Sequence, residues 1–365
     1  VLGRGGDQAV IRQNDIYKFF GGRAQEVEKR TKVKARVVAH ALENLIKESN
    51  KVMIMGHANP DIDAMGSSIG IYRLARSLEK NAYIITSNTP TLQSFKESLL
   101  EEPEYEDVLI SKEVAEENID EDTLLVIVDT HKINYVESQE VLNKAKKIVI
   151  IDHHRRSADY IENATLTFQE VYASSAAELV TELLQYAEVN VELKKIEAES
   201  LYAGIMMDTK SFTFKTGVRT FEAAAYLRKC GVDIIRVKKW FQSDLESFNK
   251  IADIVKKAEI VNDTIAIAIC DNANPKDVGL LCAKAADELL TISDVTASFV
   301  LGDVGNKITI SGRSIGDINV QVILEKLGGG GHITLAGAQV EGMTMEEVRQ
   351  ELIIRINEYF TEIEN

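Results

Sequence analysis

The stretch that decides the fold reads Ile148-Val149-Ile150-Ile151-Asp152-His153-His154. Its first four residues are apolar and β-branched, which is typical of a strand buried on both faces of a sheet. A carboxylate and two imidazoles follow where such a strand would end. A second stretch has the same form, because Leu124-Leu125-Val126-Ile127-Val128 precedes Asp129-Thr130-His131. Acidic and imidazole side chains repeated at strand ends indicate a functional site, since packing alone does not require them.

The sequence around these two stretches alternates short strands with helices. Further strands are expected at 52–55 and 82–86, with a helix at 64–78 between them. This order predicts an α/β fold in which a parallel sheet carries helices on both faces. Ligands of such sheets bind at the carboxyl ends of the strands, and that is where the polar motifs lie.

Four segments are expected along the chain. They are a remnant of a preceding domain with its connector, a larger α/β domain that holds the polar motifs, a linker helix, and a smaller α/β domain. Their predicted ranges are 1–34, 35–243, 244–258 and 259–365. The chain opens at Val1 and not at a methionine, so we interpret it as part of a longer protein.

Composition narrows the classes of function. The 365 residues carry a formal net charge of −15, and a binder of long nucleic acid needs a basic surface. A small anionic substrate is compatible with this charge if bound cations invert the local field. No apolar run of about 18 residues occurs, so this sequence is not expected to span a membrane. The cysteines at 230, 270 and 282 lack metal-binding spacing and are interpreted as free thiols of a reducing cytoplasm.

The first polar motif is His57-Ala58-Asn59-Pro60-Asp61-Ile62-Asp63. A loop between strand and helix could aim His57 and Asp61 at one cation, and Asp63 at a neighbouring one. Carboxylates mixed with imidazoles suit Mn²⁺ and similar ions, and two such ions favour attack on a phosphorus ester. The alternative interpretation is that Asp61 or Asp63 caps the following helix.

Three other motifs offer the same ligand types. Asp129 directly follows a buried strand, where a carboxylate is costly unless it is paired or coordinated. Its two oxygens could bridge two ions. Adjacent side chains on an extended segment point opposite ways, so one of His153 and His154 could bind metal while the other faces the substrate. Asp208 ends a predicted helix, where the helix dipole disfavours an anion and a cation would compensate.

A glycine run lies in the smaller domain, after a helix predicted at 319–327. The run consists of Gly328, Gly329, Gly330, Gly331 and His332. Four glycines exceed what a helix stop requires, and they let the backbone approach a ligand and offer N–H groups to a phosphate. A flexible hinge is the alternative. Arg313 and Ser314 precede the run, and the arginine could hold a phosphate or simply lie on the surface.

Together these motifs resemble those of the DHH phosphoesterase superfamily. The stretches that begin at His57, Asp129 and Asp152, followed by Asp208, match its metal motifs in order, and the glycine run is similar to its DHH-associated C-terminal domain. Within that superfamily, residues 204–212 and 3–9 resemble the membrane-bound cyclic-di-AMP phosphodiesterases of Gram-positive bacteria.

The resemblance implies a site with two Mn²⁺ ions that share Asp129. One ion would be held by His57, Asp61, Asp129 and Asp208. The other would be held by Asp63, Asp129 and His153. His154 would contact the scissile phosphate, Asp152 would orient a neighbouring histidine, and His131 or His154 would protonate the leaving oxygen. The far part of a dinucleotide would be held by Arg313, Ser314 and Gly328 to His332.

The implied reaction is hydrolysis of cyclic-di-AMP to 5′-pApA. A hydrolase of short linear oligonucleotides, a pyrophosphatase and a non-catalytic nucleotide sensor remain as alternatives. The resemblance also implies a cytoplasmic domain of a protein that other segments anchor in the bacterial membrane, and it leaves a homodimer open.

Overall fold

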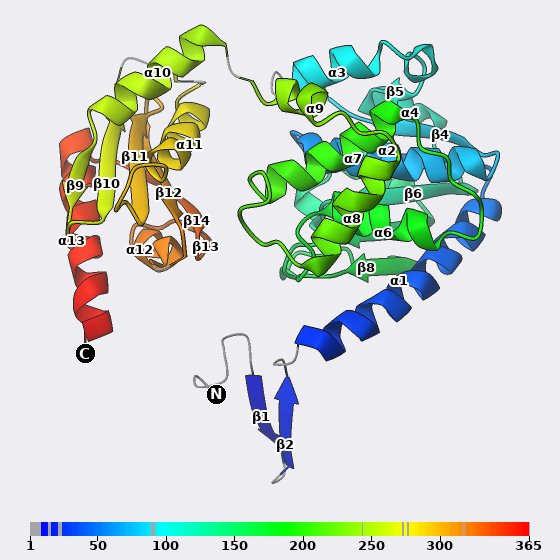
Figure 1. The fold of residues 1–365 in the computed structure, drawn as a ribbon, viewed down its shortest axis with the longest axis horizontal. Helices are drawn as coiled ribbons and strands as arrows, with labels where there is room; N and C mark the ends of the chain where they lie inside the picture. Colours follow the sequence, from blue (N-terminus) through cyan, green and yellow to red (C-terminus); the bar gives the residue numbers. More distant parts are fainter. Residues whose placement is uncertain are drawn as a thin grey trace. The chain divides into compact units, whose positions relative to one another are not determined.

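The computed structural model describes residues 9–13, 16–20, 24–87, 89, 92–242, 244–271, 274–275, 277–316 and 318–364. The chain forms two compact units, Val1–Phe241 and Gln242–Asn365 (Figure 1). Residues 3–8, which carry most of the resemblance at the start of the chain, lie outside the described residues. Within the described residues, none of the helices combines the length and the hydrophobicity that a membrane span requires.

The first unit begins with a hairpin and a long helix. Strands β1 (Ala9–Gln13) and β2 (Ile16–Phe20) pair antiparallel. Helix α1 (Ala24–Lys47) follows, and its second half places Ala35, Val38 and Leu42 in the core. The chain thus enters the large sheet from a helix that is anchored by apolar packing.

A parallel sheet forms the centre of the first unit, and this confirms the predicted fold class. Its strands lie in the order β5-β4-β3-β6-β7-β8, and every neighbouring pair is parallel. The strands are β3 (Lys51–Met55), β4 (Asn81–Ile85), β5 (Leu109–Ile110), β6 (Thr123–Val128), β7 (Lys147–Asp152) and β8 (Leu166–Gln169).

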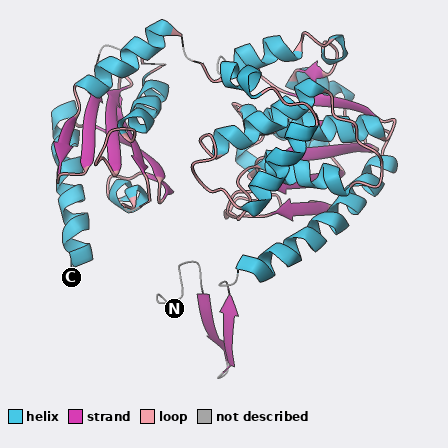
Figure 2. Ribbon diagram, in the orientation of Figure 1, coloured by secondary structure: helices cyan, strands magenta, loops and turns pink. Residues whose placement is uncertain are grey.

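Helices cover both faces of this sheet, as Figure 2 shows. The helices are α2 (Ile62–Ser77), α3 (Gln93–Leu99), α4 (Lys112–Asn118), α5 (Gln139–Lys144), α6 (Ala176–Tyr186), α7 (Lys195–Asp208), α8 (Val218–Lys229) and α9 (Ile234–Trp240). Alternate residues of β6 enter two different apolar clusters, because Leu124 and Val126 join one while Leu125 and Ile127 join the other. Each such side chain contributes about 1.5–3 kcal/mol when fully buried.

The second unit is a mixed sheet with helices on both faces. Its strands lie in the order β13-β14-β12-β11-β10-β9, and only β10 and β11 pair parallel. The strands are β9 (Glu259–Val261), β10 (Ile265–Cys270), β11 (Ala297–Asp303), β12 (Lys307–Ser314), β13 (Gly330–His332) and β14 (Leu335–Glu341). The helices are α10 (Leu245–Lys256), α11 (Val278–Leu289), α12 (Val320–Glu325) and α13 (Met345–Glu364). Ile251 and Ile254 of α10 pack in one apolar cluster with α11, so this helix is built into the second unit.

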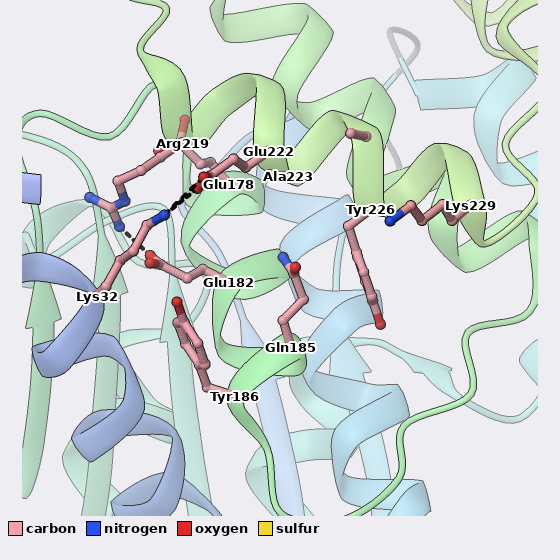
Figure 3. A pocket seen from close by; sticks show the side chains of 11 residues that line it. Lys32, Glu178, Glu182, Gln185, Tyr186, Arg219, Glu222, Ala223, Tyr226 and Lys229 are labelled. Carbon is pink, nitrogen blue, oxygen red and sulfur yellow. Dashed lines mark hydrogen bonds and ion pairs between the residues drawn. The ribbon is translucent and has the colours of Figure 1, made fainter. Parts of the chain in front are cut away.

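A cavity of about 400 Å³ lies between α1, α6 and α8 of the first unit (Figure 3). Two ion pairs lie in its lining, Lys32 with Glu222 and the nearly buried Arg219 with Glu182. These pairs join α1 and α6 to α8. Among the described residues, no group of potential metal ligands lines this cavity, so we place the chemistry elsewhere.

Candidate metal centre

The carboxyl ends of β3, β6 and β7 meet at one edge of the large sheet. His57 and Asp61 lie in the loop from β3 to α2, Asp129 follows β6, and His153 follows β7. Asp208 is the last residue of α7. A cavity of about 220 Å³ opens there, with His57, Asp129 and Asp208 in its wall.

Ligand atoms in this region fall into overlapping groups whose members lie within 4.8 Å of one another. One group is His57, Asp61 and Asp129, a second is Asp63, His153 and Asp208, and a third is Asp129, His153 and His154. Asp208 thus groups with Asp63 and His153, whereas the resemblance had placed it with His57 and Asp61.

Asp61 serves the helix and the site together. Its Oδ1 accepts from the backbone N–H groups of Asp63 at 2.9 Å and Ala64 at 3.0 Å, which caps α2. Its Oδ2 lies 3.8 Å from His57 Nε2. The capping interpretation and the ligand interpretation are therefore compatible, because each uses one oxygen.

His57 presents a single nitrogen to the site. Its Nδ1 lies 3.0 Å from the carbonyl oxygen of Ala58, which can only accept, so Nδ1 carries a hydrogen. Nε2 lies 3.5 Å from Asp129 Oδ2. Burial lowers the pKa of His57, but Asp129 and Asp61 outweigh it and raise that pKa to about 11. The neighbouring carboxylates thus favour a positive charge at this place, which a proton or a metal cation can supply.

Asp129 lies between the first two groups in a strained conformation. Its φ is +59°, a left-handed value that non-glycine residues adopt at a cost and that is common at functional sites. Oδ2 faces His57, and Oδ1 lies 3.3 Å from His153 Nε2. Burial raises the pKa of Asp129, yet contacts with His153 and His57 outweigh it and lower the pKa to about 2. A buried carboxylate that stays charged, with its two oxygens aimed at two groups, is suited to a shared ligand.

Asp63 is the fully buried member of the second group. Its two oxygens accept from the N–H groups of Ala176 at 2.7 Å and Ala177 at 2.8 Å, at the start of α6. Burial, followed by the charges of Asp129 and Asp208, raises the pKa of Asp63. Burial also raises the pKa of Asp208. Three carboxylates this close repel one another, and a cation among them would relieve the repulsion.

The fit to metal ions rests on atoms that lack ordinary partners. Asp129 Oδ1 and His153 Nε2 are buried and, within the described part of the chain, have no hydrogen bond. His153 Nε2 lies 3.0 Å from Asp208 Oδ2 and 3.3 Å from Asp129 Oδ1, without the angles of a hydrogen bond. Such unsatisfied atoms are costly unless something lies between them. These donors therefore fit divalent cations that accept both imidazole and carboxylate.

Asp152 connects two histidines and is itself fully buried. One oxygen contacts His131 Nδ1, and the other lies 2.8 Å from His154 Nδ1. Burial raises the pKa of Asp152, but the contacts with His131 and His154 outweigh it and hold the pKa below its usual range.

His131 and His154 differ in access. His131 is buried, and its Nε2 accepts from the N–H of Ser157 at 2.9 Å, so both of its ring nitrogens are engaged. The side chain of His154 is 44% exposed, and its Nδ1 is held by Asp152. Of the two histidines, His154 has a nitrogen available to a substrate.

Of the predicted substrate-binding residues of the second unit, Arg313 and Ser314 end the interior strand β12, and Gly330 lies in the edge strand β13. Arg313 is buried, and its Nε donates to Asp287 at 3.1 Å, so its charge is partly engaged inside the unit. Ser314 ends β12 and donates its N–H to Thr334. Gly328 has a φ of +75° after α12, and Gly330 begins β13.

The glycine run divides into two kinds of position. A Cβ at Gly329 would lie 2.3 Å from the carbonyl oxygen of Gly337, and one at Gly331 would lie 2.4 Å from that of Leu335. Among the described residues, a Cβ at Gly330 would meet nothing within 4 Å. Gly329 and Gly331 are thus required by the fold, while Gly330 leaves room beside the strand. The side chain of His332 lies outside the described part.

Sequence reasoning missed two residues of the centre. Tyr135 stacks on His57, with ring centroids 5.2 Å apart, and only the pairing of distant loops brings them together. Gly204 of α7 lies against Asp63, where a Cβ would be 2.7 Å from Asp63 Oδ1. The stretch around Gly204 was noted as part of the resemblance, but its spacing gave no sign of this contact.

Comparison with known proteins identifies two domains along this chain. The DHH family, N-terminal domain, matches residues 51–205, and the DHHA1 domain matches residues 262–362. The chain is 47% identical over 365 residues to a cyclic-di-AMP phosphodiesterase GdpP of Geobacillus thermodenitrificans, covering 98% of the chain and 55% of the relative. It is 44% identical, with the same coverage, to a cyclic-di-AMP phosphodiesterase PdeA of Listeria monocytogenes. The chain thus spans about half the length of these relatives.

A solved structure shares the fold. It is an exopolyphosphatase-related protein from Bacteroides fragilis with a TM-score of 0.77 and 21% identity, covering 90% of this chain and 98% of that one. The two matched domains occur in the order predicted from the sequence motifs. The chain therefore belongs to the DHH family and carries a DHHA1 domain after its DHH domain.

Proposed function

We propose that the chain is a two-metal phosphodiesterase that hydrolyses cyclic-di-AMP to the linear dinucleotide 5′-pApA. The observation that carries the proposal is the meeting of two imidazoles and four carboxylates at one sheet edge, with buried ligand atoms that have no hydrogen bond to any residue the structure describes. The names of the two relatives reported above support the choice of substrate.

The proposed ligand sets follow the groups of the structure. His57, Asp61 and Asp129 would hold one ion, and Asp63, His153 and Asp208 would hold the other, with Asp129 facing both groups. His154 is left out of both sets, because Asp152 occupies its Nδ1. Mn²⁺ is the proposed metal, since Mg²⁺ prefers sites made only of oxygen ligands and water.

When bound, two such ions supply an activated water and neutralise charge on the reacting phosphate. The side chains of the protein orient the ligand atoms and the groups that contact the substrate. Asp129 stays ionised at neutral pH and faces both ligand groups. His154, held at Nδ1 by Asp152, presents Nε2 to the scissile phosphate and donates a proton to the leaving 3′ oxygen. His131 acts through Asp152 and does not touch the substrate.

We further propose that the second unit binds the far nucleotide. The open space beside Gly330 allows a ligand to approach the β13 backbone. The nearby Arg313 adds positive charge, moderated by Asp287.

The proposal is tested by Asp129→Asn, which keeps the shape of the side chain and removes its charge. Hydrolysis of cyclic-di-AMP in saturating Mn²⁺ should fall at least a hundredfold, about 2.7 kcal/mol of barrier. Asp107→Asn, at an exposed aspartate of the same unit, is the matched control and should leave the rate unchanged. If Asp129→Asn retains more than a tenth of the activity, the shared-ligand role is wrong.

A further inference from the structure

Residues 131–137 join the two loops that carry the histidine ligands. On one side, Ala58 N–H donates to the carbonyl of Tyr135 at 2.7 Å, and Glu137 N–H donates to the carbonyl of Gly56 at 3.1 Å. An isolated β-bridge pairs His57 with Val136. The loop that carries His57 is thus fastened to this segment by backbone hydrogen bonds on both sides of the ligand.

On the other side, the same segment is fastened to the chain that follows His153 and His154. Ile133 N–H donates to the carbonyl of Asp159 at 3.0 Å, and Ile161 N–H donates to that of His131 at 2.9 Å. A second isolated bridge pairs Lys132 with Tyr160. The 131–137 segment therefore sets the spacing between the His57 loop and the loop after β7.

Within this segment, Tyr135 contacts a proposed ligand directly. The Tyr135 and His57 rings are stacked with an interplanar angle of 6°. Tyr135 is 46% exposed, so its ring is not part of the apolar core. Its backbone lies in η4 (Ile133–Tyr135), where its N–H donates to the carbonyl of Lys132 at 3.2 Å and its carbonyl accepts from Ala58 N–H. A half-exposed aromatic ring fixed by its backbone and lying flat on an imidazole is placed to hold that imidazole.

We propose that Tyr135 is a positioning residue for His57. This inference rests on the metal centre of the proposed function. The carbonyl of Ala58 fixes which nitrogen carries the hydrogen, and Tyr135 fixes the plane of the ring. Together they keep Nε2 directed at Asp61 and Asp129. Residues that orient a metal-binding histidine commonly change metal affinity by 10- to 100-fold when they are replaced.

The test is a calorimetric Mn²⁺ titration of the metal-free chain without nucleotide. Tyr135→Leu, which removes the ring, should weaken one of the two Mn²⁺ sites about tenfold and leave the other unchanged. Tyr135→Phe keeps the stacked ring and should titrate like the parent chain. Tyr135→Met is a second ringless variant for use if Tyr135→Leu does not fold, and thermal melting in EDTA establishes folding for each.

A double-mutant cycle separates positioning from any other role. In a His57→Ala background, Tyr135→Leu should cause no further loss of Mn²⁺ affinity, because the ring that it orients is gone. An additive loss there, or a ringless variant that binds both ions like the parent chain, overturns the inference. A parent chain that binds no Mn²⁺ overturns the metal centre as well. Failure to cleave cyclic-di-AMP would refute the proposed substrate and leave this inference standing.

Discussion

Gly204→Ala tests whether the packing of α7 against Asp63 is what builds the second ligand group. The added Cβ would lie 2.7 Å from Asp63 Oδ1 and 2.8 Å from Ala177 Cβ. Ordinary contact begins at 3.4 Å, so Asp63 and α7 must separate by about 0.7 Å. Asp63 is held by the N–H groups that start α6, and Asp208 lies one helical turn beyond Gly204. The displacement therefore acts on two proposed ligands together.

The expected stability change of Gly204→Ala is small. Overpacking costs about 1–3 kcal/mol, and alanine gains about 1 kcal/mol over glycine inside a helix. The net loss is therefore about 0–2 kcal/mol, or up to roughly 8 °C in Tm for a unit of this size. The effect on Mn²⁺ affinity should be larger, about 10- to 100-fold at the second group, because two carboxylates move.

Gly70→Ala is the matched control for this experiment. Its Cβ would lie 2.5 Å from Val180 Cγ1 and 3.1 Å from Leu201 Cδ2, which are ends of apolar side chains and not ligands. Both glycine variants are assayed by thermal melting in EDTA, Mn²⁺ titration and hydrolysis rate. Gly70→Ala should show a stability loss with unchanged Mn²⁺ affinity. If Gly204→Ala keeps the Mn²⁺ affinity and rate of the parent chain, the packing argument is refuted.

Three further predictions concern the loops and the protons of the site. Gly330→Val should raise KM for cyclic-di-AMP about tenfold, or about 1.4 kcal/mol of binding, without changing Tm. Gly329→Ala should instead lower the Tm of the second unit, because its added Cβ would collide with the backbone carbonyl of Gly337. Equal Tm losses in the two variants would contradict this. His154→Gln should lower kcat more than His131→Gln does, because only His154 is proposed to touch the substrate, and the reverse order would exchange their roles. The pKa values of His57 and His153 are raised without metal, so both are protonated at pH 7 and must lose protons to bind Mn²⁺. Mn²⁺ affinity should therefore rise with pH. Calorimetry in two buffers with different ionisation heats should give two different apparent binding enthalpies, because each buffer takes up the released protons. Equal binding enthalpies in the two buffers would contradict this prediction.

The large sheet could be predicted because its central strands are uninterrupted apolar runs. β6 and β7 were expected from residues 124–128 and 148–151, and they occupy Thr123–Val128 and Lys147–Asp152. β8 was not expected, because Leu166–Gln169 is short and only partly buried. β14 was also missed, since Leu335–Glu341 is rich in small residues and gains its pairing from β12.

The meeting of the site residues follows from topology. The carboxyl ends of parallel strands share an edge, so motifs after β3, β6 and β7 come together whatever the loops do. The grouping of Asp208 with Asp63 could not be predicted this way, because it depends on how closely α7 passes Asp63 at Gly204. The stacking of Tyr135 on His57 depends on a backbone bridge between two loops far apart in the chain, which no local pattern encodes.

The central claim is that this site cleaves cyclic-di-AMP. The most direct measurement is chromatographic product analysis after incubation of the chain with Mn²⁺ and either cyclic-di-AMP or linear pApA, at equal concentrations and with an EDTA control. We predict that cyclic-di-AMP is converted to 5′-pApA, faster than pApA is converted to AMP, and that EDTA abolishes the conversion. Intact cyclic-di-AMP beside rapid cleavage of pApA would contradict the claim and assign the chain to linear substrates.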